Sequence, residues 1–114
     1  MAKKNKAGTL QVIRGTGNVF ADLGFADAEE RQTKLRLALA INQIIEQKNL
    51  TQAAAAALLK VNQPKVSALL RYKLDGFSVE RLMTFLTSLD RDVEISIKKK
   101  SRSHTSGRIS VIAA

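Results

Sequence analysis

The sequence predicts an all-α protein, a compact bundle of four to five helices with one short β-strand added near the C-terminus. The chain has 114 residues, which is enough for one compact domain. Its hydrophobic fraction is 45%, but its aromatic fraction is only 4%, so Leu, Ile, Val and Ala must build the core. Such a core suits small packed helices. Apolar residues follow the helical period before Asp90 and alternate strictly only after it.

The first predicted helix covers about residues 27–47. Asp27 is a candidate N-cap, and Glu29 and Glu30 follow in the first turn, where the helix dipole favours negative charge. Lys48 and Asn49 end the pattern. The apolar positions that predict its buried face are Leu35, Ala38, Leu39, Ile41, Ile44 and Ile45.

Two short helices follow, separated by a three-residue break. Thr51 caps the first, over residues 52–59, and Lys60-Val-Asn62 forms the break. Asn62 then caps the second, with Pro64 in its first turn, where the missing N–H costs nothing. This spacing predicts a helix-turn-helix, an arrangement whose second helix enters the major groove of DNA.

A fourth helix is predicted after the turn at Asp75-Gly76. Ser78 is its N-cap, and Phe77 and Leu82 are placed to form a hydrophobic staple across that cap. The residues that give this helix one apolar face are Val79, Leu82, Met83, Leu86 and Leu89.

Strict alternation after Asp90 predicts a strand over residues 91–98. Val93, Ile95 and Ile97 fall on one side of it. Because a lone strand cannot satisfy its own backbone, it needs a partner. Two partners are open, the N-terminal arm and the same strand of a second subunit. We favour the second, which makes these three apolar residues the contacts of a two-fold homodimer.

The chain therefore divides into four predicted segments. Residues 1–18 form a flexible N-terminal arm with three glycines, and residues 19–90 form the helix-turn-helix domain. Residues 91–98 are the dimerisation strand, and residues 99–114 are a disordered basic tail.

The net charge of +9 is unevenly distributed along the chain. Residues 1–14 and 98–114 contain cations and no acid, and the same is true of residues 48–73. That central basic stretch lies between two acidic ones. The pattern favours a polyanionic partner, because each neutralised phosphate releases condensed counterions.

The helix-turn-helix also places specific side chains. Ala56 falls where the two helices cross, and Val61 anchors the turn. Gln63 suits a bidentate pair with adenine, Lys65 a guanine or phosphate, and Ala68 a thymine methyl. Gln52 starts the first of the two helices, where it suits a backbone phosphate. The predicted DNA-binding residues are Gln52, Lys60, Asn62, Gln63, Pro64, Lys65, Ser67, Ala68 and Arg71.

The segment from Leu50 to Arg71 resembles the XRE family, the Cro- and lambda-repressor-like regulators. The Thr-Gln opening, the alanine at the crossing and the Val-Ser in the third helix carry the resemblance. It implies a five-helix domain over about residues 27–90 and a palindromic double-stranded DNA operator. One residue departs from the family pattern, because Lys60 stands where the turn usually has glycine with a positive φ.

The segment from Asn18 to Glu30 resembles the HigA-like antitoxins, in which a short strand also follows the last helix. The resemblance implies the antitoxin and autorepressor of a type II toxin-antitoxin pair, with a RelE/ParE-type toxin as partner. The alternative is a stand-alone phage- or host-type transcriptional repressor without a toxin.

An enzyme is not expected. His104 is the single histidine, cysteine is absent, and no cluster has metal-ligand spacing, so we expect no metal, no catalytic residue and no cofactor. No apolar run approaches the roughly 18 residues that span a membrane. The expected location is the cytoplasm, in association with the nucleoid.

Overall fold

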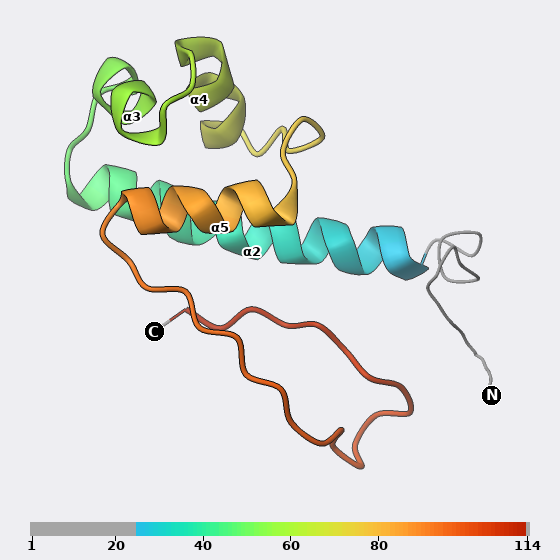
Figure 1. The fold of residues 1–114 in the computed structure, drawn as a ribbon. Coiled ribbons are helices and arrows are strands. Elements are labelled where there is room, and N and C mark those ends of the chain that lie inside the picture. Colours follow the sequence, from blue (N-terminus) through green and yellow to red (C-terminus); the bar gives the residue numbers. More distant parts are fainter. Residues whose placement is uncertain (1–24, 114) are drawn as a thin grey trace. The chain divides into compact units, whose positions relative to one another are not determined.

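The computed structural model describes residues 25–113, and the helices among them are α2 (Phe25–Gln47), α3 (Gln52–Leu59), α4 (Gln63–Leu70) and α5 (Val79–Ser88) (Figure 1). The chain divides into two compact units, residues 1–32 and 33–114. All packing described below lies within the second unit. The predicted arm over residues 1–18 lies outside the described residues.

The helices begin and end for local reasons. Thr51, Asn62 and Ser78 cap α3, α4 and α5, each with extended backbone and a side-chain oxygen that accepts a backbone N–H. These three predicted caps are confirmed. The helix α2 starts at Phe25, so Asp27 lies in its first turn instead of capping it.

Each of the four helices within residues 25–113 is followed by a residue in the left-handed conformation, and none of these four residues is glycine. A side chain with positive φ carries some strain, which glycine would avoid. The four residues are Asn49 (φ 55°), Lys60 (φ 60°), Tyr72 (φ 59°) and Asp90 (φ 64°).

The core is built mainly from aliphatic side chains of the four described helices, α2 to α5. Its largest fully buried members are Ile41, Leu69, Leu82, Leu89 and Val66. Among the expected core residues of α2, Ala38, Ile41, Ile44 and Ile45 are buried, whereas Leu35 and Leu39 are 44% and 47% exposed. Leu37 is buried instead, because it lies one helical turn before Ile41 on the inward face.

The start of α5 confirms the predicted hydrophobic staple residues as core residues. Phe77 is 2% exposed and Leu82 is fully buried. The ring of Phe77 meets that of Phe85 edge-on, with centroids 5.9 Å apart. Such T-shaped pairs are favoured by the aromatic quadrupole, and this pair fixes the connection between α4 and α5.

The C-terminal segment differs from the prediction. Within the described chain, residues 91–113 contain neither a helix nor the expected strand. Val93 packs against the core, but Ile95 and Ile97 are 76% and 93% exposed. The alternation is present, yet a strand exists only when a neighbour accepts its backbone hydrogen bonds, and no strand among residues 25–113 pairs with residues 91–98.

The same segment turns back on itself (Figure 1). Lys100 Nζ donates to the carbonyl of His104 at 2.9 Å and so closes a polar turn. Farther on, Val111 packs against the core, and its carbonyl accepts a hydrogen bond from Arg36 Nη1 at 3.5 Å. We call residues 91–113 the C-terminal arm. Disorder over residues 99–114 stays a prediction.

No helix in the described part of the chain is long and apolar enough to cross a membrane.

Candidate nucleic-acid interface

The predicted helix-turn-helix is present. The helices α3 and α4 have eight residues each and are joined by the three residues 60–62 (Figure 1). Ala56 is 8% exposed, and its carbonyl accepts the N–H of Val61 at 3.1 Å. Val61 packs partly buried against the core, as expected of an anchor for the turn. Small residues inside α3 let the two helices approach closely.

Lys60 begins the turn in the left-handed conformation, with φ 60° and ψ 44°. Its backbone N–H donates to the Ala56 carbonyl, so the backbone follows the path expected for glycine while carrying a lysine. The Lys60 side chain is exposed. An exposed cation therefore stands at the corner between the two helices.

Asn62 fixes the first turn of α4. Its Oδ1 atom accepts the backbone N–H of Lys65 at 2.9 Å. Pro64 lies in the first turn, where no N–H is needed. The Asn62 oxygen serves as the cap, and the amide N–H₂ group of the same side chain can donate to a ligand. The cap leaves Gln63 and Pro64 exposed at the start of the helix.

The two faces of α4 are clearly different. Val66 and Leu69 are buried at 0% and 1% exposure. The opposite face presents Gln63, Pro64 and Arg71 as exposed side chains, with Ser67 half-buried among them. We call these four residues the outer face of α4. The Arg71 Nε atom donates to the Ser67 carbonyl at 3.3 Å, which holds the arginine side chain along the helix.

Two predicted contact residues lie away from the centre of this face. Ala68 is half-buried and packs against the core, so only its edge is accessible. Lys65 is also half-buried, and its Nζ atom lies 3.4 Å from the Gly76 carbonyl and 5.0 Å from the centroid of Phe77. The sequence places Lys65 in the contact helix, but the structure directs its ammonium group toward the α4–α5 connection.

Gln52 is the first residue of α3 and is exposed beside the Thr51 cap. The Thr51 Oγ1 atom accepts the N–H of Ala54 at 3.0 Å, so one of the free N–H groups of the helix start is used. The side chain of Gln52 and the remaining N–H groups suit an anionic oxygen there.

The electrostatics of this region follow from its sequence. Between Lys48 and Lys73 the chain contains five cations and no acid. Lys48, Lys60, Arg71 and Lys73 are all exposed. Within the described residues, no group of His, Cys, Asp or Glu could hold a metal ion. The region offers hydrogen bonds and positive charge, which suit a phosphate backbone and base edges.

The sequence did not indicate a groove next to this region. It has a volume of about 490 Å³ and includes Tyr72, which is 40% exposed and has a positive φ. Seven residues from different parts of the chain line it: Asn42, Ile45, Glu46, Asn49, Leu50, Leu70 and Tyr72. No spacing along the chain could have predicted it.

Comparison with known proteins places this geometry in a family. Residues 19–98 match the helix-turn-helix domain family. A solved structure described as an XRE family transcriptional regulator is 69% identical, with a TM-score of 0.74 over 77% of this chain and 99% of that chain. None of the curated proteins matches. The chain belongs to the XRE family of helix-turn-helix transcriptional regulators.

Proposed function

We propose that this protein represses transcription by binding an operator in double-stranded DNA through the outer face of α4. One observation carries the proposal: α4 buries Val66 and Leu69 while presenting Gln63, Ser67 and Arg71 on its other side. A helix that is anchored by one face and polar on the other fits the major groove, which is wide enough to admit it.

Each side chain of this face has a role that its chemistry supports. Gln63, in the first turn, suits the bidentate pair with adenine. Arg71 suits guanine or a phosphate, and Ser67 lies between the two as a smaller donor. Lys60 and Gln52 flank the groove-facing helix and suit backbone phosphates on either side. The base contacts give sequence preference, and the phosphate contacts give affinity.

We further propose that the protein acts as a homodimer. The C-terminal arm exposes apolar side chains at Ile95, Ile97 and Ile112, the last of which is 85% exposed. A second copy that adds its arm would cover these side chains and accept the backbone hydrogen bonds of residues 91–98. A two-fold dimer then reads two half-sites about 34 Å apart.

Hydroxyl-radical footprinting of the DNA upstream of its own gene tests the operator and the dimer together. The proposal predicts two protected segments on one side of the duplex, separated by about one helical turn. A single protected segment would contradict the dimer, and uniform protection would contradict the operator.

We propose that this protein is the antitoxin of a toxin-antitoxin pair and that it represses the genes of that pair. Support for this comes from the resemblance of Asn18–Glu30 to the HigA-like antitoxins, and most of that segment lies outside the described residues. Co-expression with the adjacent open reading frame tests it. Growth arrest by the neighbour alone, relieved by this protein, supports an antitoxin. A harmless neighbour indicates the stand-alone repressor instead.

A further inference from the structure

Lys65 makes two contacts that hold it against the connection between α4 and α5. Its Nζ atom donates to the carbonyl of Gly76 at 3.4 Å and lies 5.0 Å from the centroid of the Phe77 ring. A Cβ atom at Gly76 would come within 3.1 Å of that Nζ atom, so the missing side chain leaves the room that the ammonium group occupies. The ammonium group is attracted to both the carbonyl dipole and the face of the ring.

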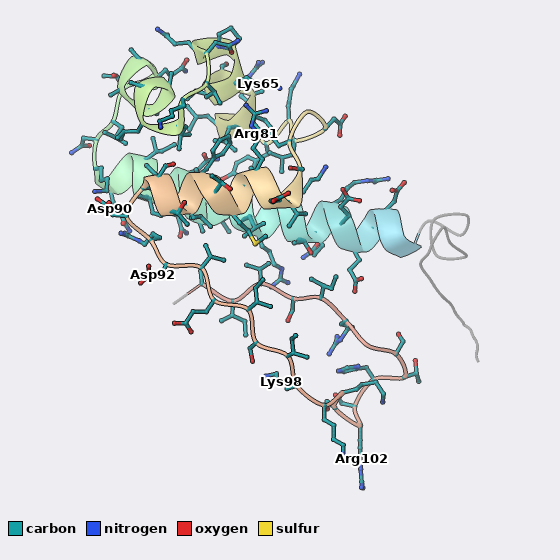
Figure 2. The ribbon with its side chains drawn as sticks, in the orientation of Figure 1. Lys65, Arg81, Asp90, Asp92, Lys98 and Arg102 are labelled. Atoms are coloured by element: carbon teal, nitrogen blue, oxygen red, sulfur yellow. The ribbon has the colours of Figure 1, made fainter. Side chains whose placement is uncertain are left out.

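The contact continues into the core. Phe77 packs edge-on against Phe85, with centroids 5.9 Å apart. The guanidinium of Arg81 lies 5.7 Å from the centroid of Phe85. Two cations thus flank a pair of perpendicular rings, and Figure 2 shows Lys65 and Arg81 beside the α4–α5 connection. Phe77 is 2% exposed and Phe85 is 3% exposed, so the rings themselves cannot shift freely.

We infer that Lys65 is a positioning residue, which fixes the pose of α4 on the core instead of contacting DNA. The inference rests on the proposed function, because the pose of α4 matters through what its outer face touches. Lys65 follows Gln63 by two residues, so its stem points away from Gln63 around the helix. Holding that stem against Phe77 sets the rotation of α4 about its own axis, and hence the direction of Gln63 and Ser67.

The alternative is a direct phosphate contact by Lys65. The two roles predict different salt dependence. A lost phosphate contact lowers the slope of log Kobs against log salt by about 0.9 per contact. A lost positioning contact leaves the number of neutralised phosphates unchanged and lowers only the preference for the operator.

Fluorescence anisotropy on the upstream DNA and on a shuffled duplex separates the two roles. For Lys65→Met we expect the operator preference to fall roughly 3- to 10-fold with an unchanged salt slope. Phe77→Leu changes no charge and should act in the same direction. Lys65→Arg keeps both contacts and should restore the preference. A slope reduced by about 0.9 per subunit in Lys65→Met would overturn the inference.

A second measurement does not depend on operator recognition. In the nuclear magnetic resonance spectrum of the free protein, the ε-methylene protons of Lys65 should be shifted upfield by the Phe77 ring, and Phe77→Leu should remove that shift. Addition of any duplex that binds should leave the shift in place. Its loss on DNA binding would show that Lys65 moves to a phosphate. If the wild type shows the shift but no operator preference, the proposed function fails while the docking of Lys65 stands.

Discussion

Asn62 Oδ1 accepts a hydrogen bond of 2.9 Å from the backbone N–H of Lys65, and this contact sets where α4 begins. Asn62 itself has extended backbone, with φ −81° and ψ 165°, so the helix cannot extend backwards into the turn. The next two residues, Gln63 and Pro64, are therefore the first turn and are exposed. The side chain of Asn62 therefore contributes to the stability of α4 and determines that Gln63 is its first residue.

Asn62→Ala should lower the free energy of unfolding by about 1 kcal/mol, because alanine leaves an N–H of the first turn without its acceptor. Asn62→Ser keeps a capping oxygen and should stay close to the wild type. Urea denaturation followed by circular dichroism measures both. Equal stability of the alanine variant and the wild type would show that this cap contributes nothing.

Substitutions of Lys60 separate the effect of its left-handed backbone on stability from the effect of its charge on DNA binding. Lys60→Gly should raise the free energy of unfolding by about 1 kcal/mol, since glycine adopts the left-handed conformation at no steric cost. Lys60→Ala should not stabilise. Both should weaken DNA binding on every sequence alike and reduce the salt slope by about 0.9 per subunit. Wild-type salt dependence in both variants would exclude Lys60 as a phosphate contact.

Gln63→Ala should cost roughly 1–3 kcal/mol at one base position of the operator, because alanine cannot make the proposed bidentate pair with adenine. Binding to a panel of operators, each changed at one base pair, measures the effect. The Gln63→Ala variant should bind equally well to operators that differ only at the base pair that Gln63 contacts. An equal loss on every duplex would mean that Gln63 reads no base.

Replacing both Ile95 and Ile97 with lysine should dissociate the proposed dimer, because each subunit would have to bury two charges where we propose that the arms meet. Sedimentation velocity over a range of protein concentrations measures the mass. Glu94 and Ser96 lie on the other side of the alternation, so replacing both of them with lysine is the matched control. Dissociation by the control pair as well would point to general charge repulsion.

The starts of α3, α4 and α5 were predictable from the sequence because a cap is a local interaction, whereas the start of α2 was predicted two residues late. Thr51, Asn62 and Ser78 each bond to an N–H three residues farther along the chain. The three-residue turn was predictable for the same reason, and so was the positive φ of Lys60 within it. Structural features that depend only on residues a few positions apart can therefore be predicted from the sequence.

Features that depend on distant partners were not predictable. The spacing of Leu35 and Leu39 fits a helix, but which face turns inward depends on the elements that cover α2. Lys65 is a predicted contact residue, and nothing near it in the sequence reveals that its ammonium group lies against Gly76 and Phe77. Residues 91–98 have the alternation of a strand, yet pairing requires a second segment that alternation cannot supply.

The most direct test of operator recognition by α4 is the affinity of the purified protein for the DNA upstream of its own gene, compared with its affinity for a shuffled duplex of the same composition. Fluorescence anisotropy at about 0.15 M salt keeps long-range charge effects near their physiological strength. If α4 recognises an operator, the protein should prefer its own upstream DNA by a factor of roughly 10³ or more. Equal, weak and salt-sensitive binding to both duplexes would show only attraction between a basic protein and a polyanion, and would contradict operator recognition by α4.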